Sequence, residues 1–499
     1  MNDKLNNALN QISSKHLSEA ENYQRPSRRP YWIAAVAAVL AVVIGICAAG
    51  GRSLPEPGPT LPVLQGNFSD VPNPSGIQKP DTWQFANLVA APEYPQMVQR
   101  PSSTEYPNYA EYDALYQTWL QSQGRQYNQP NGYAASLEKF FAESIPLFLK
   151  AEENSAYSPV NVYMALAMLA ETTDGNSRQQ ILDLLGLGSI EELRSQVKHV
   201  WNAHYCDDGV TTLLLGNSLW LDSNFSFHQS TADRLASDYY AASFHGDLGT
   251  EEMDEQLQAW LNANTGGLLQ EQAKNIKMDP HTVFALASTV YFAADWKNEF
   301  YAKNTQDMLF HCGEYDLMTP FMRNLLPYGT YYRGSNFGAV CLELEGQNSM
   351  WLILPDEGYT VADILESDEY LQLSMTGQCE RRGVYEIHLS MPKFDVVSET
   401  DLTNGLKEMG ITDVFDPTVS DFTAISDTPN LFVGGARHAA RVTVDEEGVL
   451  AAAFTVLLTY GTSASTPPPE MDFTLDRPFL FIISSRDNLP LFAGTVTEP

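Results

Sequence analysis

Residues 445–453 read DEEGVLAAA, and residues 454–470 continue as FTVLLTYGTSASTPPPE. An acidic pair and a glycine come first, small and apolar residues follow, and the stretch ends in polar, proline-rich sequence. The run AAAFTVLL taken alone reads as a buried strand. The alternate residues from Val449 to Leu457 are small or apolar, none is charged, and no proline interrupts them. Such a segment is suited to be a central strand of a packed sheet.

Composition limits what the rest of the chain can do. The 499 residues are 44% hydrophobic and 18% charged, which is typical of a globular protein. A formal net charge of -33 repels phosphate backbones, so no nucleic acid partner is expected. The five cysteines form no C-x-x-C pair, and the nine histidines form no i, i+4 pair. Without a nucleotide loop or a nucleophile motif either, we expect no enzyme, metal site or cofactor.

The N-terminal part contains an uncharged apolar run at residues 31–51, YWIAAVAAVLAVVIGICAAGG. As a helix this run would be roughly 30 Å long, the thickness of a bilayer core. Arg25, Arg28 and Arg29 precede it, so residues 1–30 are predicted to be a cytoplasmic tail and the rest extracellular. A cleaved secretory signal is the alternative, but the long polar lead and the length of the run favour a single-pass signal-anchor.

Three further regions follow the predicted transmembrane helix. Residues 52–80 are rich in proline and glycine and are predicted to be a linker. Residues 81–133 carry too many aromatic residues for a free linker and are predicted to pack as a collar or N-terminal extension. Residues 134–499 form the main domain, in which helical patterns come early and strand patterns late. This order indicates an α+β fold.

The main domain resembles the serpins, the serine protease inhibitor family. The motifs that carry the resemblance occur in order and include NSAYSPVNVYMALAML (154–169), FALASTVYFAADWKNEF (284–300), WLILPDEG (351–358), HAARVTVDEEG (438–448), DRPFLFII (476–483) and PLFAGTV (490–496). The resemblance implies a large central antiparallel-rich sheet, two smaller sheets, about nine helices and an exposed reactive loop. It also implies a suicide-substrate mechanism, in which a protease cuts the loop and is held in a covalent complex while the loop inserts into the main sheet.

The resemblance assigns roles within the loop. Its hinge would consist of Glu446, Glu447, Gly448, Val449, Ala451, Ala452 and Ala453. Family spacing places the reactive bond between Thr462 and Ser463, with Tyr460 as the alternative bait. Thr462 suits the narrow primary pocket of an elastase-like or subtilisin-like protease, whereas Tyr460 would suit a chymotrypsin-like or broad subtilisin pocket. No Arg or Lys lies between Val449 and Glu470, so a trypsin-like target is not expected.

Two further groups match residues that control loop insertion in the family. The shutter would contain Ser158, Asn161, Ser288 and His438, and the breach would contain Trp296 and an ion pair between Lys393 and Glu446. The predicted partner is a serine protease, with papain-like cysteine proteases as secondary targets. The resulting prediction is a membrane-anchored, bacterial-type inhibitor. The alternative is a non-inhibitory serpin that acts as a surface binding module.

Overall fold

The computed structural model describes residues 36–48, 88–446 and 467–499, apart from residues 96, 103–105, 107, 275 and 314. The predicted tail at residues 1–30 and the predicted linker at residues 52–80 lie outside the described residues.

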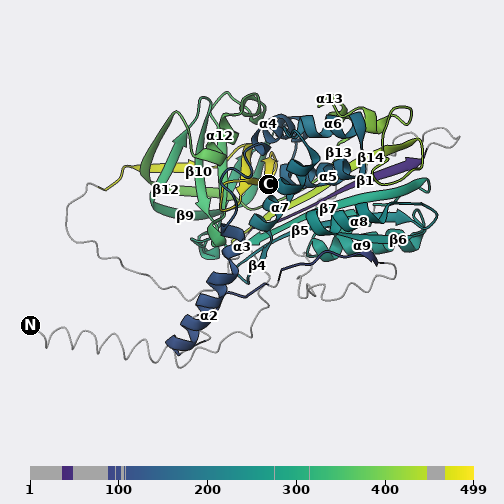
Figure 1. The fold of residues 1–499 in the computed structure, drawn as a ribbon. Helices are drawn as coiled ribbons and strands as arrows, with labels where there is room; N and C mark the ends of the chain where they lie inside the picture. The colour runs from purple at the N-terminus through teal and green to yellow at the C-terminus, as the bar shows by residue number, and fades with distance from the viewer. Residues whose placement is uncertain are drawn as a thin grey trace, which may run out of the picture.

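Most strands of the first sheet run antiparallel, and its order along the hydrogen-bonded path is β13-β14-β1-β7-β5-β6-β2, with β4 paired to β5. Figure 1 shows this sheet as the long lower layer of the molecule. Its strands are β13 (Phe394–Asp401), β14 (Leu431–Val444), β1 (Val36–Ala48), β7 (Thr282–Ala294), β5 (Thr211–Asp222), β6 (Ala241–Gly246), β2 (Leu88–Ala90) and β4 (Cys206–Asp207).

Strand β1 corrects one prediction made from the sequence. Residues 31–51 were expected to form a transmembrane helix, but Val36–Ala48 form a strand between β14 and β7, antiparallel to both. In Figure 1 this purple strand lies beside the yellow-green β14 and the teal β7. The physical reason is that a strand buried on both faces is also a continuous apolar run, and its valines and isoleucines favour extended backbone. Among the described helices, none combines the length and apolar character needed to cross a bilayer.

The second sheet has the order β15-β12-β9-β10-β11-β16-β17-β3, with β8 paired to β9. The two smaller sheets that were expected are joined in the described chain, because the last residues of β9, Tyr331 to Arg333, pair with the start of β10. The strands of this second sheet are β15 (Glu470–Thr474), β12 (Arg381–Pro392), β9 (Asp316–Arg333), β10 (Phe337–Glu343), β11 (Ser349–Pro355), β16 (Phe479–Ser484), β17 (Pro490–Val496), β3 (Ser155–Tyr157) and β8 (Gln306–His311).

The helices enclose two hydrophobic cores on opposite faces of the first sheet. Helix α5 is buried along its whole length and contacts β1, β7 and β17, so the main core lies between the two sheets. Helix α9 covers the other face over β5 and β7, around Trp220 and Trp260. The helices are α2 (Tyr109–Ser122), α3 (Gly124–Tyr127), α4 (Leu137–Phe148), α5 (Pro159–Thr172), α6 (Gly175–Leu184), α7 (Ile190–His204), α8 (Gln229–Tyr239), α9 (Glu251–Asn264), α10 (Gln270–Ala273), α11 (Val361–Leu365), α12 (Glu369–Thr376) and α13 (Thr403–Glu408).

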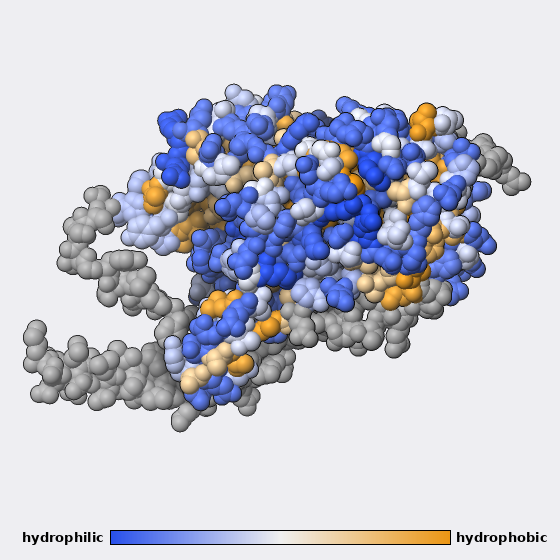
Figure 2. Space-filling view, viewed as in Figure 1, coloured by the Kyte–Doolittle hydropathy of each residue, from blue (hydrophilic) through white to orange (hydrophobic). Residues whose placement is uncertain are grey.

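The described part of the collar packs on the main domain. Strand β2 pairs with β6 and forms that edge of the first sheet, and the Tyr94 ring stacks on Tyr205. Further along, the indole of Trp119 donates a hydrogen bond to Asp208 Oδ2 at 3.1 Å. Helix α2 buries no residue, and it projects from the body in Figure 1. Figure 2 shows apolar residues on α2, within a visible face that is otherwise largely polar.

Candidate reactive-loop slot

The position between β7 and β14 is the centre of the candidate site, and we call it the slot. The two strands that border the slot are parallel to each other, and β1 is antiparallel to both. The predicted reactive loop begins where β14 ends, at Val444, and it is followed by β15 at Glu470. A chain that left β14 and turned back into the sheet would therefore enter the slot in the same direction as β1.

The side chains of residues 41–47 of β1 fill the slot on both faces. Val42, Ile44 and Ile46 belong to the main core, and each is at most 1% exposed. On the opposite face, Ala41 and Val43 pack into the core under α9. Because successive side chains of a strand point to opposite faces, this alternation is what a fully enclosed central strand requires.

The predicted shutter residues come together behind the slot. Ser158 caps α5, where its hydroxyl accepts a hydrogen bond from the Asn161 amide at 3.2 Å, and Pro159 occupies the first helical position. Serine at the cap and proline at the first helical position both favour a helix start. The Ser288 hydroxyl donates to Asn161 Oδ1 at 2.7 Å, which joins β7 to α5. The motif SPVN therefore fixes the start of α5 and holds β7 against it.

His438 completes the shutter from the other side of the slot. Its Nε2 accepts a hydrogen bond from the Ser158 amide at 3.4 Å, and its ring meets Tyr157 edge-on. Burial lowers the pKa of His438 to about 3, so the imidazole is neutral. Within the described residues, His438 Nδ1 and Asn161 Nδ2 are buried without a hydrogen-bond partner. Val42 of β1 lies opposite both His438 and Ser288 in the two registers.

The predicted breach residues lie at the end of the slot where β14 finishes. Lys393 Nζ is 2.5 Å from Glu446 Oε2, and the hydroxyl of Thr305 donates to the other oxygen of the same carboxylate. Burial opposes ionisation of Glu446, but the hydrogen bonds from Lys393 and Thr305 outweigh it and lower the pKa. The indole of Trp296 donates to the Asp445 carbonyl at 2.9 Å. These contacts hold the backbone at residues 445–446, just before the predicted hinge.

The remaining predicted site residues lie outside the described residues. They are the hinge positions Glu447, Gly448, Val449, Ala451, Ala452 and Ala453, the reactive pair Thr462 and Ser463, and the alternative bait Tyr460. Their roles therefore remain predictions from the sequence.

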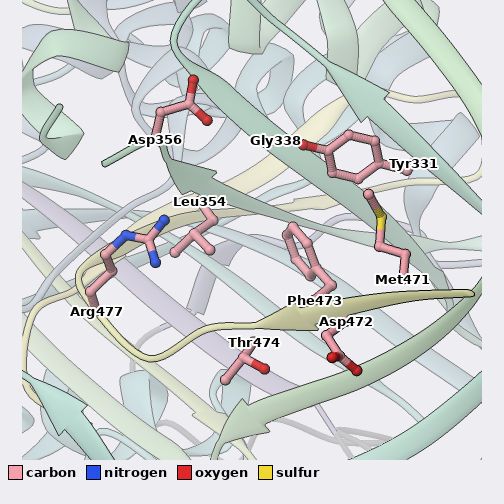
Figure 3. Close-up of a pocket in the computed structure, with 9 residues that line it drawn as sticks. All are labelled: Tyr331, Gly338, Leu354, Asp356, Met471, Asp472, Phe473, Thr474 and Arg477. Atoms are coloured by element: carbon pink, nitrogen blue, oxygen red, sulfur yellow. The ribbon is translucent and has the colours of Figure 1, made fainter. Parts of the chain in front are cut away.

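A separate cavity of about 330 Å³ lies in the second sheet, beside the strand that follows the loop. Figure 3 shows Phe473 and Met471 of β15 on one side of it and Tyr331 on the other. Arg477 closes one end, where its guanidinium donates to the Pro355 carbonyl at 2.8 Å and contacts Asp476. The Arg-Pro-Phe motif thus anchors the turn between β15 and β16 against the end of β11.

Two contributors to the site were missed by the sequence analysis. Thr305 reaches Glu446 from a 3-10 turn, and nothing in its local sequence marks it. Val42 lies between the two sides of the shutter, although its segment was interpreted as a membrane helix. The sequence does contain a signal for Val42, since the alternate apolar residues from Val36 to Ala48 fit a buried strand as well as a helix.

Comparisons with known proteins agree with this architecture. The model of the family described as Serpin (serine protease inhibitor) matches residues 136–499. Serpin-ZX of Arabidopsis thaliana is 28% identical over 72% of this chain and 95% of its own, and the leukocyte elastase inhibitor of Xenopus laevis is 28% identical over 71% and 96%. Among solved structures, the native state of the thermophilic serpin tengpin has a TM-score of 0.64 at 24% identity, over 74% of this chain and 95% of that one. The chain belongs to the serpin family.

Proposed function

We propose that this serpin inhibits serine proteases of the elastase or subtilisin type by presenting its reactive loop as a suicide substrate. The observation that carries the proposal is the slot itself. The first sheet accepts an additional antiparallel strand of 13 residues between β7 and β14, with its backbone paired on both sides. A cleaved loop that entered there would form ladder hydrogen bonds along its length.

The loop sequence has the length and the side chains that the slot requires. A four-residue connection after Val444 would place Val449 opposite Val444, where Val36 now lies. From Val449, 13 residues extend to Gly461, which equals the length of β1. In this register the face of Val449, Ala451, Ala453, Thr455 and Leu457 would enter the main core, and small or apolar groups can be buried there at low cost.

The proposed cut lies between Thr462 and Ser463, one residue beyond that inserted length. A protease with a narrow primary pocket accepts threonine and excludes larger side chains. Tyr460 remains the alternative bait for a wider pocket. Papain-like cysteine proteases are proposed as secondary targets, because they also pass through an acyl-enzyme.

We further propose that residues 31–51 can anchor the chain in a membrane, with the serpin domain on the extracellular side. This proposal rests on the uncharged run and on the arginines before it. It requires Val36–Ala48 to leave the sheet, because one segment cannot occupy both places. Flotation of the full chain with phosphatidylcholine vesicles tests it, and recovery of all protein in the unbound fraction would contradict membrane insertion.

The inhibitory function is tested by incubating the full chain with elastase or subtilisin and separating the products on a denaturing gel. A covalent band at the combined mass supports the proposed function. Cleavage of the loop without such a band, both in the full chain and in a variant that lacks residues 1–52, would instead support the alternative, a non-inhibitory serpin that acts as a surface binding module. Trypsin serves as the control, because the loop contains no Arg or Lys to fill its primary pocket.

A further inference from the structure

We propose that residues 36–48 are an internal ligand of the slot and compete there with the reactive loop, so that the protein traps a protease only after this segment has left. The inhibitory consequence rests on the proposed function, whereas occupancy of the slot does not. The site is the gap between β7 and β14, and its ligand class is an extended, uncharged, apolar segment.

Occupancy by β1 is exclusive. Its backbone pairs with β14 from Val36 to Ala48 and with β7 from Val36 to Cys47. Neighbouring strands lie about 4.8 Å apart, so the gap that holds β1 has no room for a second strand. A loop cut by a protease would find both ladder edges already paired. The acyl-enzyme would then have time to hydrolyse, and the serpin would be consumed as a substrate.

The contacts at the shutter give a physical reason for the reactive loop to replace β1. Val42 brings only methyl groups between Ser288 and His438, and it leaves the Asn161 Nδ2 and His438 Nδ1 atoms without partners. A buried polar atom without a partner destabilises the arrangement that buries it. In the register proposed for the loop, Thr455 would replace Val42 and supply a hydroxyl at this point. The loop is therefore the more complementary occupant at the shutter, but it can insert along its length only after a protease has cut it, whereas β1 needs no cut.

An engineered disulfide that can be formed and reduced would hold β1 in the slot and so test the competition with the reactive loop. Cys47 already lies on β1, and a Cβ atom built on Gly434 is 3.7 Å from Cys47 Cβ and 2.7 Å from Cys47 Sγ. Disulfides have Cβ···Cβ distances of about 3.5–4.5 Å, so a cysteine at Gly434 can bond to Cys47. Gly434 is exposed and has no positive φ, so it accepts a side chain. The neighbouring Gly435 is the matched control, because a Cβ there meets no atom within 4 Å.

The experiment compares Gly434→Cys and Gly435→Cys in the full chain, oxidised with glutathione disulfide at alkaline pH and then reduced. Alkaline pH is needed because burial, assisted by Asp279, raises the pKa of the Cys47 thiol. Peptide mapping by mass spectrometry should find the 47–434 disulfide in Gly434→Cys alone. On oxidation, its yield of covalent complex with elastase should fall by about tenfold or more and should recover on reduction. The yield of Gly435→Cys should not change.

Each other result has a defined meaning. Absence of the 47–434 disulfide, or equal crosslinking in both variants, would overturn occupancy of the slot. A disulfide without any change in complex yield would overturn the competition. A disulfide in Gly434→Cys, together with no trapping of elastase or subtilisin by a variant that lacks residues 1–52, would refute the proposed inhibitory function while leaving β1 in the slot. The crosslink and the complex therefore report on the two proposals separately.

Discussion

The free energy of unfolding of an Ile44→Ala variant shows how much the stability of the first sheet depends on β1. The Ile44 side chain is 1% exposed and belongs to the main core between the two sheets. Truncating a buried isoleucine to alanine costs about 2–5 kcal/mol, because packing is lost and a cavity remains. For a domain of this size, that loss lowers the midpoint of thermal unfolding by about 3–6 °C. Urea unfolding of the full chain, followed by tryptophan fluorescence, gives the free energy.

Val43→Ala is the matched control on the same strand. Val43 is only partly buried on the opposite face, so its truncation should cost about 1 kcal/mol or less. Ile44→Ala should also loosen β1 and increase trapping of elastase, so stability and inhibition should change in opposite directions. If Ile44→Ala differs from the parent by less than about 0.5 kcal/mol, as expected for a residue that faces lipid or solvent, then β1 is not a core strand.

Three further predictions concern the loop and the shutter. Ala451→Arg or Ala453→Pro should convert the inhibitor into a substrate, because a buried charge costs several kcal/mol and proline removes a ladder donor; undiminished complex on a denaturing gel would contradict insertion. Thr462→Arg should move the preference to trypsin-like proteases, and the peptide released from the parent should begin at Ser463 by mass spectrometry; a start beyond Thr466 would refute the assigned bond. Because the pKa of His438 is about 3 in the folded chain and about 6.5 unfolded, its contribution to stability should be complete above pH 6.5 and decline by about 1.4 kcal/mol per pH unit down to pH 3. A His438→Gln variant should lack that part of the pH dependence in urea titrations.

The serpin fold could be predicted from the sequence because its motifs are local and each has a local structural role. The motif SPVN contains the cap of α5, and the Arg-Pro-Phe motif contains the cation that anchors a turn. The ion pair between Lys393 and Glu446 could also be predicted from such motifs, and it is present. Thr305 could not be found in this way, because its contact with Glu446 joins residues 141 positions apart and depends on the path of a turn.

The N-terminal segment shows why an apolar run does not specify its own environment. Both a helix in a bilayer and a central strand satisfy every backbone donor and acceptor while burying the side chains. A helix would use all 21 residues from Tyr31 to Gly51, whereas the slot uses 13 of them. Periodicity cannot distinguish these outcomes, because valine, isoleucine and alanine are buried equally well in either.

The choice must therefore depend on what surrounds the segment. In the structure, β1 lies in the slot and is paired on both sides. Beside a membrane, Arg25, Arg28 and Arg29 can contact lipid headgroups while the run that follows enters the hydrocarbon, which leaves the slot to the reactive loop. The two proposals then describe one protein, in which membrane insertion of the segment and readiness to trap a protease are the same event. Adding phosphatidylcholine vesicles to Gly434→Cys should therefore lower the yield of the 47–434 disulfide and raise the yield of covalent complex together. A change in only one of the two yields would show that membrane insertion and trapping are separate events.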